Sequence, residues 1–202
     1  FDITKYGAAL YGFSISGGAN TSYGIMVHHP NDVFDFATYT TIAGNEIYGM
    51  ALSNPGNTSP LSYGVLVYGT DQSNTTSGVS ITTNIIHSIS GAGISLGDYS
   101  AIVTISDNMI SDIYPVQVLG EDFSAGINGR LSGMINIYNN SFTNLLCGSN
   151  LLFSSDVTMS LNDFDYSNVP CIHLETVLTP ASISFSGGSL WTITSDIVDE
   201  NG

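Results

Sequence analysis

The stretch Ala101-Ile-Val-Thr-Ile-Ser-Asp-Asn-Met-Ile-Ser-Asp-Ile113 decides the fold, because its pattern recurs along almost the whole chain. Val103 and Ile105 precede Asn108 by five and three positions, so both lie on one face of an extended strand. Further apolar residues follow two and five positions after the Asn. The Asn therefore marks a bend between two strands.

The same frame recurs in both directions along the chain. The Asn at the bend of each copy is Asn45, Asn84, Asn108, Asn140 or Asn162, and weaker copies have Gly18 or Gly188 there. Asn and Gly both tolerate the left-handed backbone conformation that a sharp corner requires, so we expect a corner at each of these positions. The shortest steps between corners approximate one turn of a solenoid, and the longer steps carry insertions.

A second pair of apolar residues follows each corner. The pairs are Ile25 and Val27, Val65 and Val67, Ile94 and Leu96, Val116 and Val118, Leu151 and Phe153, and Ile172 and Leu174. Two copies are nearly identical, Ser22-Tyr-Gly-Ile-Met-Val27 and Ser62-Tyr-Gly-Val-Leu-Val67. These repeats predict a solenoid of about seven coils.

The sequence resembles the right-handed parallel β-helix repeat family over roughly residues 10 to 198. The resemblance implies an all-β fold, with residues 1–202 as a single domain and each coil contributing strands to parallel sheets. It also implies that the corner amides stack from coil to coil. By position, that ladder is Asn45, Asn84, Asn108, Asn140 and Asn162. The resemblance leaves the activity open, since lyases, glycosidases, phage spikes, adhesins and surface-layer proteins share this architecture.

The charge balance excludes two classes of partner. The chain has 17 acidic residues, but only Lys5 and Arg130 are basic, so the net charge is −15. Nucleic acids and anionic membrane surfaces both require clustered cations, and neither is expected to bind. No run of about 18 apolar residues exists, so no membrane insertion is expected. Only 9% of the residues are charged, and the surface must therefore be formed by Ser, Thr, Asn, Gly and Tyr, as is common in extracellular β proteins.

The ends of the chain carry no recognisable cap. Each end of a parallel solenoid exposes unpaired strand edges, which soluble monomers usually cover. Neither residues 1–12 nor residues 195–202 form an evident helical cap, and a chain that begins with Phe1 suggests a processed protein or a fragment. Either the chain is part of a longer protein, or the terminal coils pair with other subunits by continuing the sheets.

Carboxylates for glycoside hydrolysis could come from two groups. These are Asp98, Glu121 and Asp122, or Asp156, Asp163 and Asp165. Hydrolysis needs such groups to face one another across coils, and nothing marks either group as more than a solvated cluster. No catalytic residue is assigned.

The single basic residue in the body of the chain is Arg130. The resemblance implies a possible lyase activity, because related lyases use an Arg or Lys base, commonly with calcium. Arg130 lies in a Gly-rich stretch, residues 120–133, which we expect to be a flexible surface insertion.

Metal and cofactor sites are not expected. The four histidines are His28, His29, His87 and His173. His28 and His29 point in opposite directions on a strand, without a third ligand nearby. Asp107 and Asp112 could bind calcium, but the spacing of a calcium loop is absent.

Three further features leave alternatives open. Cys147 and Cys171 could form a disulfide between adjacent coils or remain buried thiols. Asn57 and Asn74 lie in turn-rich insertions and could carry glycans. Trp191 and the 11 tyrosines could form a sugar-binding platform or stack within the coils.

Together these observations favour a non-enzymatic structural protein, extracellular or on the cell surface. Its terminal coils would self-assemble end to end into a filament, sheath or surface layer, and the resemblance extends toward prokaryotic, especially archaeal, proteins of that kind. The alternative is a carbohydrate-binding or carbohydrate-active domain, glycosidase-like or lyase-like, from a larger surface protein with a polysaccharide as partner. A third possibility, an ice-binding solenoid, needs a regular array of Thr, and we expect the Thr residues not to recur in register.

Overall fold

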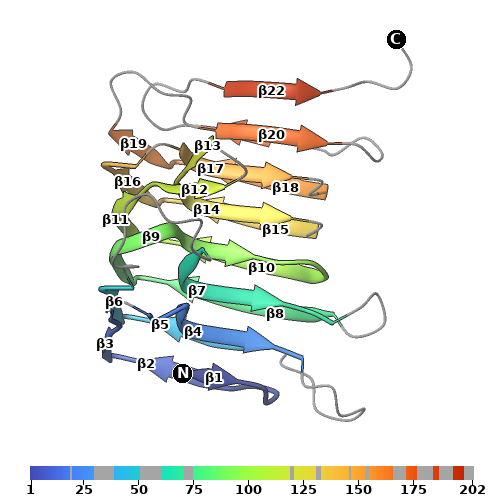
Figure 1. The fold of residues 1–202 in the computed structure, drawn as a ribbon. Coiled ribbons are helices and arrows are strands. Elements are labelled where there is room, and N and C mark those ends of the chain that lie inside the picture. The colour runs from blue at the N-terminus through green and yellow to red at the C-terminus, as the bar shows by residue number, and fades with distance from the viewer. Residues whose placement is uncertain are drawn as a thin grey trace.

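The computed structural model describes residues 1–18, 20–29, 39–50, 61–70, 75–118, 121–130, 133–145, 147–152, 155–165, 172–176, 184–186 and 193–197. Its strands stack as the rungs of a ladder, from β1 at one end to β22 at the other (Figure 1). No helix occurs among these described residues. The fold class predicted from the sequence, an all-β parallel β-helix, is confirmed.

Two large parallel sheets form the body, and the larger branches at one long strand, β9 (Ile85–Leu96). Residues 91–96 of β9 pair in a ladder that we call sheet A, and residues 85–90 pair in one that we call sheet C. Sheet A contains β1 (Asp2–Ile3), β4 (Tyr23–His28), β7 (Ser62–Tyr68), β9, β14 (Ala125–Arg130), β17 (Cys147–Leu152), β20 (Ile172–Thr176) and β22 (Ile193–Ile197). Sheet C contains β3 (Ser14–Ser16), β6 (Glu46–Tyr48), β9, β11 (Met109–Tyr114), β16 (Ser141–Thr143) and β19 (Asp163–Asp165).

The second large sheet, sheet B, has seven strands. They are β2 (Ala9–Tyr11), β5 (Thr41–Ala43), β8 (Thr76–Thr82), β10 (Ser100–Ser106), β15 (Gly133–Tyr138), β18 (Ser155–Ser160) and β21 (Ser184–Ser186). A separate antiparallel hairpin joins β12 (Val116–Val118) to β13 (Glu121–Phe123). Each coil thus passes through sheets B, C and A in turn.

The inward residues of the strands form the core. In sheet B, Ile42, Ile81, Ile105, Ile137 and Met159 lie opposite one another on successive strands, and all are 0% exposed. Each buried aliphatic side chain stabilises the fold by about 2 kcal/mol relative to exposure. The alternating apolar residues before each Asn are therefore inward residues of sheet B.

Side-chain amides stack at the corner between sheets B and C, in the order Asn45, Asn84, Asn108, Asn140, Asn162. From Asn84 onward, each Oδ1 accepts the backbone N–H and the side-chain N–H of the preceding Asn, as in Asn108 Oδ1 with Asn84, at 2.9 and 3.0 Å. The remaining side-chain N–H donates to a carbonyl of the preceding coil, from Asn108 to Ile81 at 2.9 Å. The Asn residues are at most 1% exposed, so each bond satisfies a polar group that water cannot reach.

The sharp bend is made by the residue before each ladder Asn. These residues are Gly44, Thr83, Asp107, Asn139 and Leu161, all with positive φ. The ladder Asn residues themselves do not have positive φ. The expectation that Asn occupies the left-handed position is therefore wrong: the amide is selected for its hydrogen bonds, and its neighbour carries the strain, about 1 to 2 kcal/mol where it is not Gly.

In the first coil, the ladder position belongs to Phe13 and not to Gly18. Leu10 lies opposite Ile42, and three residues later the Phe13 N–H donates to Asn45 Oδ1 at 2.9 Å. The expected copy with Gly18 at the corner is wrong because a backbone N–H alone can begin the ladder. Gly188, the other predicted Gly corner, lies outside the described residues.

Glycines form a second inward column, in sheet A, at Gly24, Gly64, Gly93, Gly126 and Gly148. A Cβ added at Gly64 would lie 2.6 Å from the Gly93 carbonyl oxygen and 2.7 Å from Ile86 Cγ2. A Cβ at Gly93 would meet the Gly126 oxygen at 2.8 Å. This column has no room for a side chain, which explains the repeated Ser-Tyr-Gly motif.

One pair of apolar residues that was predicted for sheet A belongs to another element. Val116 and Val118 belong to the β12–β13 hairpin, and Ile127 on β14 lies opposite Ile94 instead. Alternation alone cannot distinguish a hairpin strand from a sheet strand, whereas Gly126 marks the correct register. Residues 125–130 are therefore a strand and not part of a flexible insertion.

The next predicted pair in sheet A is shifted by two residues. Ser149 lies opposite Ile127, and Leu151 lies opposite Gly129. Phe153, the predicted partner of Leu151, lies outside the described residues.

Sheet B places several Thr residues in register, contrary to expectation. Thr41, Ser80, Thr104, Asn136 and Thr158 lie opposite one another on successive strands. Ser and Asn interrupt the Thr series, however. The exposed Tyr138 stands beside this column on the same face, so the face is not the uniform Thr array of the ice-binding hypothesis.

The sheets begin with β1, β2 and β3, and no described strand pairs with the outer edges of these three strands. Residues 198–202, which follow β22, lie outside the described residues. Within the described part of the chain, no helix has the length and apolar character needed to cross a membrane.

Candidate functional site

An open groove of about 490 Å³ lies on the outward face of sheet A, at the carboxyl ends of β7, β9 and β14. Its lining includes Tyr63, Leu66, Tyr68, Asp98, Tyr99 and Arg130, and we call it the sheet A groove. A volume of this size is typical of ligand-binding clefts, which span roughly 300 to 1,000 Å³.

Side-chain size on three neighbouring strands creates the groove. Ser95 on β9 lies between Leu66 on β7 and Asn128 on β14. Two residues after Ser95, Gly97 lies opposite Tyr68, because the Gly97 N–H donates to the Val67 carbonyl at 2.7 Å. Small residues on β9, between larger residues on β7 and β14, leave a groove that runs along β9.

Gly97 also fixes the position of Tyr68. A Cβ at Gly97 would lie 2.9 Å from the Tyr68 Cβ. Because Gly97 has no Cβ, the Tyr68 Cβ can lie close to the Gly97 backbone. Arg130 is the next outward residue on β14, one position after the Gly129 that pairs with Leu96. Tyr68 and Arg130 therefore face each other across Gly97.

The turn from β9 to β10 brings Asp98 and Tyr99 to the groove. The Ser100 N–H donates to the Gly97 carbonyl at 3.3 Å, closing the turn, and the Ser100 hydroxyl donates to the same oxygen at 2.9 Å. Tyr99 has a φ of 60°, at a turn position usually filled by Gly or Asn. A residue with a side chain is strained in this conformation, which also occurs at the solenoid corners.

Arg130 and Asp98 form an ion pair at the groove, with Arg130 Nε 3.7 Å from Asp98 Oδ1. Their side chains are 61% and 44% exposed, so the pair contributes little to stability. Arg130 lies at the surface, as expected, but it is the last residue of strand β14 and does not belong to an insertion.

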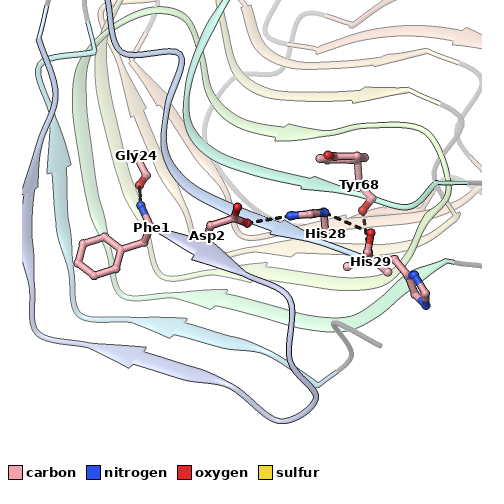
Figure 2. Close-up of polar contacts among 7 residues, drawn as sticks. Phe1, Asp2, Gly24, His28, His29 and Tyr68 are labelled. Atoms are coloured by element: carbon pink, nitrogen blue, oxygen red, sulfur yellow. Dashed lines mark hydrogen bonds and ion pairs between the residues drawn. The ribbon is translucent and has the colours of Figure 1, made fainter. Parts of the chain in front are cut away.

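A second polar group adjoins the groove at Tyr68 (Figure 2). The His28 ring is stacked on the Tyr68 ring, with centroids 5.3 Å apart and planes 6° apart. His28 Nε2 lies 2.8 Å from Asp2 Oδ1, and His28 Nδ1 lies 3.2 Å from the His29 carbonyl oxygen. The His28 ring thus covers one face of the Tyr68 ring, and Asp2 contacts His28.

Two tyrosines of the groove, Tyr63 and Tyr68, are neutral hydrogen-bonding groups. Burial raises the pKa of Tyr63 above its ordinary value of 10.0. Burial, the negative charge of Asp2 and the neighbouring Tyr23 raise the pKa of Tyr68. Both phenols therefore keep their protons at neutral pH and can donate as well as accept.

The two predicted carboxylate groups are placed only in part. Asp98 lies at the groove. Glu121 and Asp122 lie on the separate hairpin strand β13, and Asp163 is exposed on β19. Asp156 on β18 and Asp165 on β19 are placed by their backbone alone. Since the structure gives Glu121, Asp122, Asp156 and Asp165 by backbone position only, the grouping of these carboxylates stays a prediction.

The histidines occupy separate places. His29 is 1% exposed, whereas His28 faces Asp2, in agreement with the expected opposite orientations. His87 is stacked on Tyr48 at 5.2 Å and lies 3.5 Å from Glu46 Oε1. His173 lies on β20.

Asp107 and Asp112 contact the following coil. Asn139 Nδ2 donates to Asp107 at 2.6 Å, and Asn144 Nδ2 donates to Asp112 at 2.7 Å. These two carboxylates stabilise outer corners of the solenoid. Within the described residues, no group of three or more possible metal ligands is found.

Other predicted sites fall partly or wholly outside the described residues. The Cys147 thiol donates to the Ser149 carbonyl at 3.2 Å. Its predicted partner Cys171, the sequons at Asn57 and Asn74, and Trp191 lie outside the described residues.

Comparisons with known proteins add little. No protein-family model matches the chain, and no curated protein matches it in sequence. Among solved structures, the chain is similar to the crystal structure of an alginate lyase from Paenibacillus sp. str. FPU-7, with a TM-score of 0.40 and 11% identity. The match covers 89% of this chain and 77% of that chain. A similarity this weak carries no argument about activity.

Proposed function

We propose that this chain is a polysaccharide-binding parallel β-helix domain of an extracellular or cell-surface protein, and that the sheet A groove holds the glycan. The observation that carries the proposal is the set of three tyrosines, Tyr63, Tyr68 and Tyr99, lining one open groove. Tyrosine rings provide apolar faces for sugar rings and hydroxyls that exchange hydrogen bonds with them.

Two further features support binding in the groove. Ser95 and Asn128 supply a row of uncharged polar groups along its floor. The turn between β9 and β10 holds Tyr99 at the groove, with a left-handed backbone like that of the solenoid corners. The proposal assigns binding and no chemical step.

Affinity gel electrophoresis tests the proposal. Soluble polysaccharides are cast into the gel, both uncharged (xylan, mannan, mixed-linkage β-glucan) and acidic (polygalacturonate). At least one should retard the wild-type chain. Tyr99→Gly should lose about 1 kcal/mol of binding free energy, or about fivefold in affinity, because a stacking face is removed. Its thermal stability should stay within about 1 kcal/mol of wild type, because Gly relieves the strained backbone.

Tyr39→Gly is the matched control. Tyr39 also has positive φ, at 55°, and is 65% exposed, but it does not line the groove. This variant should bind as the wild type does. The proposal is wrong if no polysaccharide retards the wild-type chain, or if both variants bind equally well.

A second candidate function is the structural subunit predicted from the sequence. No strand among the described residues pairs with the outer edges of β1, β2 and β3, which favours this candidate because a second chain could extend the sheets there. Negative-stain electron microscopy at near-neutral pH, with the mass in solution measured alongside, tests this candidate. Regular filaments would support it, and a dispersed monomer would contradict it.

A further inference from the structure

The charges at the sheet A groove nearly cancel. Arg130 is the one cation among the lining residues, and Asp98 lies 3.7 Å from it. Lys5, the other cation of the chain, is not part of the lining. A cation paired with a carboxylate has little attraction left for an anionic ligand.

The field around the groove is negative. Asp2 raises the pKa of Tyr68, so its negative charge is felt at a groove side chain. Beyond the groove, the chain carries a net charge of −15. Like charges repel, and the repulsion reaches over roughly 8 Å at physiological salt. The negative charge of the chain would therefore repel a polyanion such as a uronic acid chain, and the one cation of the groove, Arg130, is already paired with Asp98.

The side chains that line the groove can exchange hydrogen bonds with sugar hydroxyls. Tyr63 and Tyr68 are neutral phenols, and Asn128 presents an amide. The Arg130–Asp98 pair places N–H donors beside carboxylate acceptors. A pair of neighbouring sugar hydroxyls can accept from the guanidinium and donate to the carboxylate at the same time.

From this arrangement we infer that the groove binds an uncharged glycan, with Arg130 and Asp98 acting together as a clamp on sugar hydroxyls. The inference rests on the proposed function and names the ligand class of the same site. It assigns Arg130 the role of a hydroxyl donor and not that of a partner for a ligand carboxylate.

Isothermal titration of the full chain with xylan, mannan and mixed-linkage β-glucan, and separately with polygalacturonate, tests the inference. At least one uncharged glycan should bind, and its affinity should change less than about twofold between about 0.02 M and about 0.5 M NaCl, because no net charge is neutralised. Polygalacturonate should bind at least about tenfold more weakly.

Two variants sharpen the test. Asp98→Asn and Arg130→Gln should each weaken the uncharged glycan about tenfold, because each removes one half of the clamp. For an acidic ligand the two variants would have opposite effects: Asp98→Asn would strengthen binding and Arg130→Gln would abolish it. Asp107→Asn is the control for Asp98→Asn, because it makes the same change in net charge at a carboxylate outside the groove. It should leave every affinity unchanged.

The outcomes separate this inference from the proposed function. Salt-sensitive binding of polygalacturonate alone, strengthened by Asp98→Asn, would overturn the inference and leave polysaccharide binding intact. No binding of any of the four glycans would overturn both. Binding of an uncharged glycan that neither groove variant weakens would overturn the clamp.

Discussion

The Asn ladder and the sheet A groove are built on the same coils, yet one is repetitive and the other is not. The ladder places the same residue with the same bonds at each of its corners. At the groove, one outward column consists of His28, which adjoins the groove, and of Tyr68, Gly97 and Arg130, which line it, on successive strands. Inward positions must fill the same narrow space in each coil, whereas outward positions face solvent. Repetition therefore marks positions constrained by folding, and its loss marks positions free to bind a ligand.

The largest expected effect compares a glycine of the repetitive inward column of sheet A with a glycine of the groove. Gly64→Ala would place a Cβ 2.6 Å from the Gly93 oxygen and within 2.8 Å of two core Ile side chains. Backbone and core must both shift, so the free energy of unfolding should fall by about 3 kcal/mol or more. Gly97→Ala would place a Cβ 2.9 Å from the Tyr68 Cβ, so β7 must shift slightly, but the new atom meets no core side chain. The substitution should cost less than Gly64→Ala, about 1 to 2 kcal/mol, and should weaken glycan binding.

Denaturant unfolding and glycan titration of both variants measure this difference. Gly18→Ala is the control, because nothing lies within 4 Å of its added Cβ. Equal losses of stability at Gly64 and Gly97 would contradict the distinction between the two regions.

An intermediate effect compares two asparagines. Asn108→Ala removes the acceptor of the Asn84 backbone N–H and the donor to the Ile81 carbonyl, both buried. Leaving these groups unsatisfied should lower the free energy of unfolding by about 2 to 4 kcal/mol. Asn128→Ala, in the groove, loses only partly exposed bonds to Ser95 and Asn150. It should lose less than about 1 kcal/mol and bind glycans less tightly.

Thermal unfolding followed by circular dichroism distinguishes the two asparagines. An unchanged melting temperature for Asn108→Ala would contradict the structural role of the ladder. A large loss for Asn128→Ala would mean that the groove face also contributes to folding.

The smallest expected effect is on the titration of the groove tyrosines. The pKa of Tyr63 and that of Tyr68 are raised in the folded chain, so their contribution to stability is complete below pH 10.0, the ordinary value. It is lost as the pH rises through their raised values. Asp2→Asn should lower the pKa of Tyr68, because it removes a negative charge, and should leave Tyr63 unchanged. Ultraviolet absorbance in alkaline titration, with Tyr68→Phe subtracted, measures the shift, and a shift at Tyr63 instead would contradict it.

The sequence predicted the corners well because each corner combines a buried amide with inward aliphatic residues of fixed spacing. It failed at Phe13, where a backbone N–H replaces the side chain, and at Val116 and Val118, where alternation occurs in a hairpin. The inward glycines were the missed signal. Gly126 precedes Ile127 as Gly64 precedes Val65, which would have identified β14 as a strand of sheet A.

The groove could not be predicted to the same extent. Its walls come from residues about 30 positions apart in the chain, and they meet only through strand register. Nothing in the sequence showed that Tyr99 occupies a left-handed turn position or that Asp98 lies beside Arg130.

The ladder bonds also determine how the solenoid comes apart. Asn108 donates to Ile81 in the coil before it and to Asn140 in the coil after it, so one side chain joins three coils. In a one-dimensional array of units, such nearest-neighbour coupling makes the interface terms dominate the stability of each unit. A coil in the middle loses two interfaces on opening and a terminal coil loses one. A coil that is coupled to two neighbours, such as that of Asn108, therefore opens later than a coil coupled to one.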